Sequence, residues 1–205
     1  MKHHAAMETT TKTLLDLAAQ RGLLRARDLA AAGLPRVALT RLVQQGRLLR
    51  LGRGVYALPL RGVSAHAALA EVACKQPQAV VCLLSALRFH ELTTQAPFEV
   101  WLAIANKAHP PRLTYPPLRI VRFAAPLLQD GVETHRVDGV PVRVTSVART
   151  VADCFKFRHK IGLDVALEAL RETLRNKRAS VDELWQAAGQ CRVANVMRPY
   201  LESLA

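Results

Sequence analysis

The sequence is poor in carboxylates and aromatic residues and has no long apolar run. Its 205 residues contain 16 Asp and Glu against 29 Lys and Arg, a formal net charge of +13, and only 5% are Phe, Trp or Tyr. No apolar run approaches the roughly 18–20 residues that a membrane-spanning helix needs, and the N-terminus lacks the order of a signal peptide. We therefore expect a cytoplasmic protein without a membrane partner. Because half of the residues are hydrophobic, the chain can bury a core, and its charge favours a polyanionic partner.

The cysteines are too scattered for a metal site or a disulfide framework. They form no CxxC pair, lie in apolar surroundings, and have no histidine at ligand spacing. The histidines share no HxxxH or HxH spacing either. We therefore expect buried thiols, no metal ion and no cofactor. The four thiols are those of Cys74, Cys82, Cys154 and Cys191.

Positive charge is concentrated in the first third of the chain. Residues 1–62 hold 11 Lys and Arg against three acids, a net +8, while the other 143 residues carry +5. Every basic residue after Lys12 in this part is arginine, whose planar guanidinium suits phosphate and guanine. Pro59 and Gly62 separate two well-patterned stretches, so we expect two domains, residues 1–62 and 63–205.

Three short helices are expected in the first domain. The hydroxyls of Thr9–Thr11 favour the N-cap of a first helix, which ends at Gly22. A second helix is expected over about 26–32, and a third begins at Pro35 and reaches about Gln45.

A β-hairpin is expected after these helices. Apolar residues over 48–58 flank Gly52-Arg53-Gly54, where glycine supplies the positive φ of a tight turn. We interpret the ring of Tyr56 as part of the hairpin's core, with its hydroxyl free to meet a phosphate. Three helices followed by a hairpin predict a winged helix-turn-helix.

One side of the third helix is polar and has no carboxylate. At 100° per residue, Ala38, Leu39, Leu42 and Val43 fall on the opposite side, which packs on the other helices. Val37 is the apolar exception on the polar side, where packing against the first helix is favoured over contact with a thymine methyl. Arg and Gln make paired hydrogen bonds to base edges in the major groove. We therefore select seven DNA-contacting residues on the helix and the wing: Arg36, Thr40, Arg41, Gln44, Gln45, Arg50 and Arg53.

The second part has a mixed pattern. Asp138-Gly139 joins the last two expected strands as a hairpin, and a helical tail follows. The expected fold class is α+β: an N-terminal winged helix-turn-helix, then a mixed domain with a small β-sheet and a helical C-terminal tail. Helices are expected over 65–75, 85–91, 163–175, 181–188 and 193–204, with one more that is capped by Thr145 and Ser146 and reaches about Phe157. Strands are expected over 79–83, 98–103, 118–123, 133–137 and 140–144.

No constellation of catalytic residues is recognisable in this part. It has no paired carboxylates followed by lysine on a strand, no GxSxG and no glycine-rich phosphate loop, so we expect no enzymatic activity. Arg149 and Asp153 stand at i and i+4, where we expect a helix-surface ion pair that contributes at most a few tenths of a kcal/mol.

Two segments together resemble the AbiEi-like antitoxins of type IV toxin-antitoxin systems. LAAQRGLLRARDLAAAGLPRVALTRLVQQGRLLRLGRGVYALP, Leu17 to Pro59, ends in a Gly-Arg-Gly-Val-Tyr wing that is typical of the family's N-terminal domain. VRVTSVARTVADCFKFRHKIGLDVALEALRETL, Val142 to Leu174, is similar to the family's Thr-Ser/Pro-x-x-Arg-Thr-x-x-Asp helix and the helix after it. Arg149, Thr150 and Asp153 match that second motif, and we expect them to hold the C-terminal domain together.

This resemblance implies an antitoxin that represses its own operon. The N-terminal domain would bind repeats in double-stranded promoter DNA, as cooperating monomers or as a dimer. The C-terminal domain would counteract a nucleotidyltransferase-like toxin. Without the resemblance, the sequence leaves three other hypotheses of function open. They are a stand-alone winged-helix regulator, an adaptor whose winged helix binds protein, and a DNA-processing enzyme with a winged-helix targeting domain.

Overall fold

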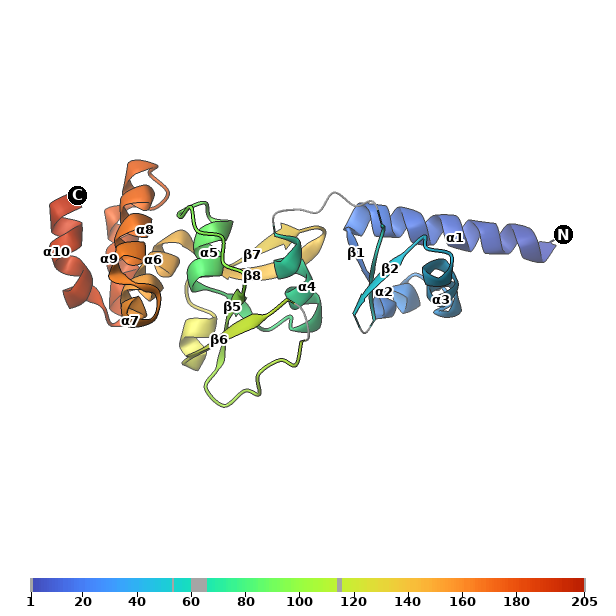
Figure 1. Ribbon diagram of the computed structural model, residues 1–205, viewed down its shortest axis with the longest axis horizontal. Helices are drawn as coiled ribbons and strands as arrows, with labels where there is room; N and C mark the ends of the chain where they lie inside the picture. Colours follow the sequence, from blue (N-terminus) through green and yellow to red (C-terminus); the bar gives the residue numbers. More distant parts are fainter. Residues whose placement is uncertain (1, 53, 60–65, 114–115, 205) are drawn as a thin grey trace. The chain divides into compact units, whose positions relative to one another are not determined.

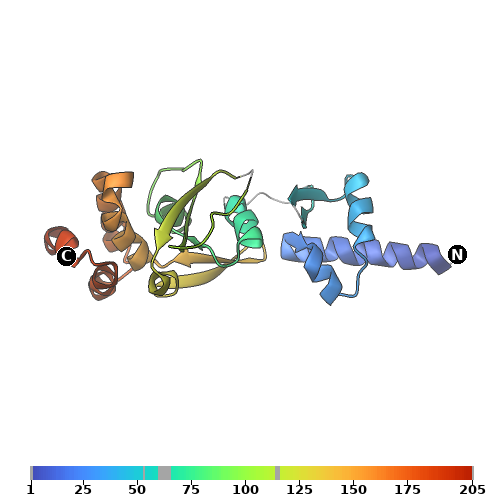
Figure 2. The same ribbon diagram turned by 90° about the horizontal axis from the view of Figure 1, so that it is seen from below.

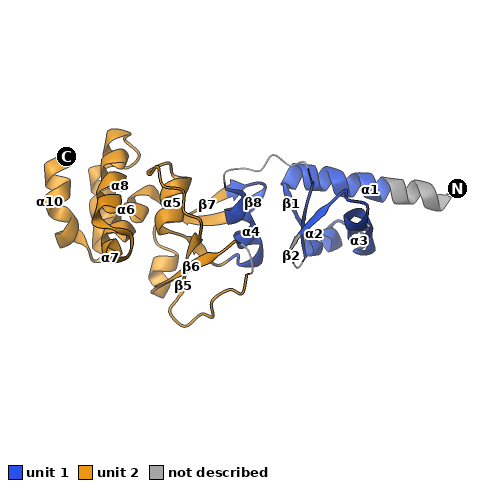
Figure 3. Ribbon diagram, in the orientation of Figure 1, with its two compact units in different colours: residues 1–77, 136–141 blue, residues 78–135, 142–205 orange. Residues whose placement is uncertain are grey.

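The chain folds into two compact units. The computed structural model describes residues 2–52, 54–59, 66–113 and 116–204 (Figure 1). The first unit combines Met1–Pro77 with Arg136–Pro141, and the second combines Gln78–His135 with Val142–Ala205 (Figure 3). The domain boundary expected between residues 62 and 63 lies outside the described residues.

The first unit contains the winged helix-turn-helix that the sequence predicts. Its strands form a three-stranded antiparallel sheet in the order β1-β3-β2, and the helix after the undescribed segment 60–65 also belongs to this unit. The elements are α1 (Lys2–Arg21), β1 (Leu23–Arg25), α2 (Ala26–Ala31), α3 (Val37–Gln44), β2 (Leu49–Gly52), β3 (Val55–Ala57) and α4 (Ala67–Lys75).

Two local features of this unit differ from the sequence-based expectation. The N-cap expected at Thr9–Thr11 is wrong, because α1 already begins at Lys2 and the Thr13 hydroxyl donates to the Thr9 carbonyl at 2.9 Å inside the helix. The strand β1 was not expected, since three residues are too few to show a period. Its pairing with β3, with Leu24 opposite Tyr56, is what makes it a strand.

Leucines from α1, β1, α2 and α3, together with Leu48, form most of the core of the winged helix. On α3 itself, Leu39 and Leu42 are each 1% exposed, as the helical period predicts, while Ala38 and Val43 pack partly buried against the same cluster. This packing determines which side of α3 faces outward. The buried cluster comprises Leu14, Ala18, Leu24, Leu29, Leu39, Leu42 and Leu48.

A five-stranded mixed sheet lies at the centre of the second unit. Its strand order is β6-β5-β4-β8-β7; β5 runs parallel to β6 and antiparallel to β4, and β4 runs parallel to β8. Asp138 and Gly139 both have positive φ, +49° and +77°, so the hairpin predicted at this dipeptide is confirmed. The strands are β4 (Val80–Val81), β5 (Val100–Ala105), β6 (Leu118–Phe123), β7 (Val132–Val137) and β8 (Val140–Thr145).

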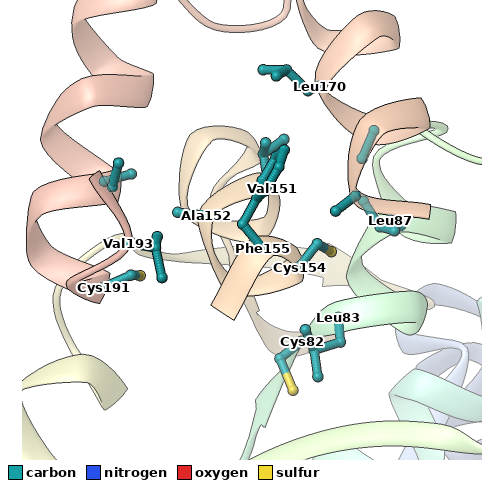
Figure 4. Close-up of a cluster of buried hydrophobic side chains, with 14 of the residues drawn as sticks. Cys82, Leu83, Leu87, Val151, Ala152, Cys154, Phe155, Leu170, Cys191 and Val193 are labelled. Carbon is teal, nitrogen blue, oxygen red and sulfur yellow. The ribbon is translucent and has the colours of Figure 1, made fainter. Parts of the chain in front are cut away.

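The helices that follow β8 gather at the C-terminal end of the second unit, beyond the sheet in both views (Figures 1 and 2). The helix α6 lies at the centre of their core, where Val151, Ala152 and Phe155 are fully buried (Figure 4). The α+β class with a helical tail is therefore confirmed. The helices are α5 (Leu83–Phe89), α6 (Val147–Lys156), α7 (Arg158–Ile161), α8 (Leu163–Arg175), α9 (Val181–Cys191) and α10 (Ala194–Leu204), with a 3-10 turn, η1, at Ala125–Leu128.

Candidate DNA-binding surface

The apolar side of α3 packs against the core, and the local sequence determines where the helix begins and ends. Pro35 precedes its first turn, and Gly46, at φ +67°, ends it while its amide donates to the Val43 carbonyl at 3.0 Å. The buried side chains of Leu39 and Leu42 set the rotation of the helix about its axis. Its polar side is therefore directed away from the core.

Every residue selected from the third helix is exposed and lies on this one face. The structure also exposes Val37, at 70%, so the expected packing of Val37 against the first helix is wrong. At 100° per residue, Val37 lies opposite the buried Leu39 and Leu42, so its side chain is directed away from the core. The face comprises Arg36, Thr40, Arg41, Gln44 and Gln45, with Val37 among them.

Two arginines of the wing were selected from the sequence, and one of them, Arg50, lies within the described residues. Arg50 of β2 pairs with Tyr56 of β3 in the sheet register, and its side chain is exposed. The Tyr56 ring is partly buried against the leucine core, in agreement with its interpretation as wing core. Arg53 lies outside the described residues.

The sequence around this face is free of negative charge. Between Asp28 and Glu71 there is no Asp or Glu, while the same stretch contains six arginines. Solvated helix surfaces usually mix both signs, because local pairs improve solubility and stability. Within this stretch, an approaching anion therefore meets arginines and no repelling carboxylate.

Three more cations lie near the start of α3 but were not selected from the sequence. Arg25, Arg27 and Lys75 line a hollow together with Arg36. Helical periodicity does not reveal such a group, because its members come from β1, α2, α4 and the residue before α3. The only sequence signal is the general excess of arginine in this part of the chain.

In the second unit, the pair expected on a helix surface is buried. Arg149 and Asp153 are 1% and 0% exposed, and the Arg149 Nε donates to both carboxylate oxygens at 3.1 Å. Arg149 Nη1 also donates to the Asp130 carbonyl at 2.8 Å, and its guanidinium lies 5.3 Å from the centre of the Phe123 ring. The surface-pair expectation is wrong, because α6 is covered on all sides by the sheet and the other helices.

Threonine hydroxyls connect α6 to β8 of the sheet. Thr150 Oγ1 lies 2.7 Å from Thr145 Oγ1 and donates to the Thr145 carbonyl at 3.1 Å. That carbonyl also accepts a hydrogen bond from His90 Nε2 at 2.7 Å. Burial lowers the pKa of His90, so this imidazole stays neutral near pH 7. Arg149, Thr150 and Asp153 thus lie inside the fold, where a partner has no direct access to them.

Asp153 also affects the chemistry of a neighbouring thiol. Burial raises the pKa of the Asp153 carboxyl, and the Arg149 guanidinium opposes that rise. Cys191 Sγ donates to Asp153 Oδ1 at 3.4 Å, and burial together with this carboxylate raises the pKa of Cys191 to about 12. The thiol is therefore protonated and structural rather than nucleophilic.

Among the described residues, no three His, Cys, Asp or Glu side chains are grouped so that they could hold a metal ion. In the same part of the chain, no helix has the length and apolar character needed to cross a membrane.

The fold and the surface of the first unit define a winged helix-turn-helix protein. Residues 12–59 match the family model described as transcriptional regulator, AbiEi antitoxin, which confirms the resemblance over that segment and supports a role as a regulator. One solved structure, the RV2827C protein from Mycobacterium tuberculosis, is 14% identical and has a TM-score of 0.57, with 88% of this chain and 71% of that chain covered. That likeness shows a shared fold. No curated protein matches the sequence significantly.

Proposed function

We propose that this protein is a transcriptional repressor and antitoxin of a type IV toxin-antitoxin operon. In this proposal, residues 1–62 form the DNA-binding domain and residues 63–205 the antitoxin domain, and the protein works in the cytoplasm without catalytic activity of its own. The observation that carries the DNA-binding half is the exposed, carboxylate-free face of α3. The match of residues 12–59 to a family of transcriptional regulators supports it.

The face of α3 has the size and the chemistry of a major-groove reader. A helix is about 10–12 Å across with its side chains, and the major groove is about 12 Å wide. Arg41, Gln44 and Gln45 would contact base edges with paired hydrogen bonds, and Thr40 a base or a phosphate. The exposed methyls of Val37 suit the C5-methyl of thymine. The wing arginines Arg50 and Arg53 would lie along the backbone or in the minor groove.

The antitoxin half is supported by the resemblance of Val142–Leu174 to the second segment of the family. In this half, Arg149, Thr150 and Asp153 hold α6 within the core rather than touch a partner, since all three are buried. Contact with a nucleotidyltransferase-like toxin, if it is direct, would use the exposed residues of the surrounding helices. Operator repeats recruit more than one protomer, as cooperating monomers or as a dimer.

Binding to the DNA upstream of the protein's own gene tests the proposal. Fluorescence anisotropy compares that duplex with a scrambled one over a series of salt concentrations. We expect tighter binding of the upstream duplex, and Gln44→Ala should weaken it by about 1–3 kcal/mol while Gln186→Ala, an exposed glutamine of α9, leaves it unchanged. Equal affinity for the two duplexes, or none for either, would contradict the repressor assignment.

Co-expression with the adjacent gene tests the antitoxin half. If the neighbour is a nucleotidyltransferase-like toxin, growth arrest on its expression should be relieved by this protein. A neighbour without toxicity would favour the stand-alone regulator, and co-purification of a protein partner without any DNA binding would favour the adaptor.

A further inference from the structure

A hollow of about 420 Å³ in the first unit lies beside the start of α3. Four separate segments supply its cations: Arg25 ends β1, Arg27 lies in α2, Arg36 directly precedes α3, and Lys75 ends α4. The backbone of Gly54 at the wing completes the wall, and the Ala26 amide donates to the Gly54 carbonyl at 2.9 Å. The wing, α2 and the start of α3 therefore border one concave site.

Among the described residues, no carboxylate lines this hollow. Asp28, the nearest acid in the sequence, accepts from the Arg25 amide at 3.2 Å and pairs with Arg21 at 3.8 Å, outside the hollow. Burial raises the pKa of the Cys74 thiol and the charge of Glu71 in α4 adds to that rise, but Glu71 does not line the hollow either. The positive charge of the site is therefore not neutralised by its own wall.

Three of the four cations have no polar partner among the residues that the structure describes. Arg27 and Arg36 are exposed and Lys75 is half-buried. None of these three side chains makes a hydrogen bond or an ion pair with a described residue. The fourth, Arg25, lies near the Cys74 thiol; burial raises the pKa of this thiol, and the Arg25 guanidinium opposes that rise. Like charges held this close repel one another, so an anion seated among them would gain charge-assisted hydrogen bonds and remove the repulsion.

The position of the hollow beside the start of α3 indicates which anion it binds. A helix inserted in the major groove fills most of its width, so the residues at its start meet the phosphates that border the groove. Arg36 belongs both to the α3 face and to the hollow. The described residues that line the hollow include no aromatic side chain, so they offer no stacking platform for a free nucleotide base. The planar forks of three arginines suit phosphate oxygens.

We propose that this hollow binds a backbone phosphate of the DNA that flanks the groove read by α3. Lys75, outside the segment 12–59 that matches the regulator family, completes the phosphate site from α4. This inference rests on the proposed DNA binding and extends the interface beyond the winged helix itself. The phosphate contact adds affinity and fixes the register of the protein on the DNA. It adds no sequence preference, because a phosphate contact reads no base.

The salt dependence of DNA binding tests the role of Lys75. Lys75→Gln should weaken binding to the upstream and the scrambled duplex by the same factor, and should reduce the slope of log K against log salt by about 1. Lys75→Arg keeps the charge and should keep the slope. The matched control is Lys107→Gln, an exposed lysine of the second unit, which should bind like wild type.

Protection of Cys74 from alkylation tests the place of the contact. Cys74 lines the hollow, whereas the other three cysteines are at most 1% exposed. Either duplex should slow alkylation of Cys74, and inorganic phosphate at an equal phosphate concentration should protect far less. Protection by inorganic phosphate without protection by DNA would identify a free-anion site and overturn the proposal.

The salt slopes of the variants and the binding of wild type separate the phosphate site from DNA binding as such. If wild type reads the upstream duplex while Lys75→Gln and Lys107→Gln give the same slope, the phosphate site is wrong and the repressor stands. If wild type binds neither duplex, the proposed DNA binding itself is wrong, and the phosphate site is overturned with it.

Discussion

Arg149 donates from Nε to both carboxylate oxygens of Asp153, each at 3.1 Å, within the core of the second unit. Both side chains are at most 1% exposed, so the pair has exchanged its hydration for protein contacts. The net contribution of the pair to stability therefore differs from the cost of removing one of its partners. The intact pair adds little net stability over well-packed apolar residues, whereas the removal of one partner leaves the other charge buried and uncompensated.

Asp153→Asn should lower the free energy of unfolding by about 3–5 kcal/mol, because it leaves the Arg149 charge without its counterion. Chemical denaturation followed by circular dichroism measures this loss. The control is Glu172→Gln, which breaks an exposed pair with Arg175 and should cost no more than about 1 kcal/mol. Equal effects of the two variants would show that burial of the Arg149–Asp153 pair has no energetic consequence.

Gly131→Ala should destabilise the second unit more than a left-handed glycine position alone requires. Gly131 has φ +64°, and a Cβ there would lie 3.1 Å from Arg149 Cβ, so the substitution combines backbone strain with a shift of the arginine. Gly46→Ala is the matched control, since it has φ +67° and no atom within 4 Å of the added Cβ. Each substitution should cost about 1 kcal/mol or more from strain, with a larger loss at Gly131 in thermal unfolding. A smaller or equal loss at Gly131 would contradict the tight approach to Arg149.

His90 should make stability fall as the pH falls below neutrality. Burial lowers its pKa from the ordinary 6.5, so the folded state binds its proton less readily than the unfolded state. The stability that His90 contributes is therefore present above pH 6.5 and is lost as the pH falls through the folded pKa. Unfolding measured from about pH 7.5 to about pH 5 should show a shallower dependence for His90→Gln than for wild type. Substitution of the exposed His159 by Gln should keep the wild-type dependence.

Arg41 and Arg53 should differ in what they contribute to DNA binding. Arg41→Ala should weaken binding to the upstream duplex by about 1–3 kcal/mol with little change for a scrambled duplex, because it is proposed to read a base. Arg53→Ala should weaken both duplexes alike, because it is proposed to contact the backbone. Arg171→Ala, at an exposed position of α8, serves as the control. Wild-type binding by both variants would refute the recognition assignment.

Native alkylation should modify one cysteine. Cys74 is partly exposed, while Cys82 and Cys154 are fully buried and Cys191 is 1% exposed. Burial also raises the pKa of each buried thiol, so little reactive thiolate is present. Mass spectrometry should find one modification in the native protein and four after denaturation. Early modification of Cys191 would contradict the packing around Asp153.

Much of the secondary structure was accessible from local sequence. The strand expected over 118–123 coincides with β6, and the helix expected over 163–175 coincides with α8. Both carry a strong period or clear end signals. The start of α1 and the strand β1 were missed, since the first depends on helix propensity before Thr9 and the second on pairing with β3.

The sequence by itself determined the winged helix, the α+β class and the polar face of α3, because helical period, glycine turns and charge are properties of neighbouring residues. The tertiary structure decided how the Arg149–Asp153 spacing is used: the i, i+4 pattern is the same on a surface and in a core, and only the packing around α6 removes water from it. It also decided the cationic hollow, since Arg27, Arg36 and Lys75 meet only when α2, α3 and α4 are folded together. Contacts between distant segments depend on the whole fold, and no local pattern contains them.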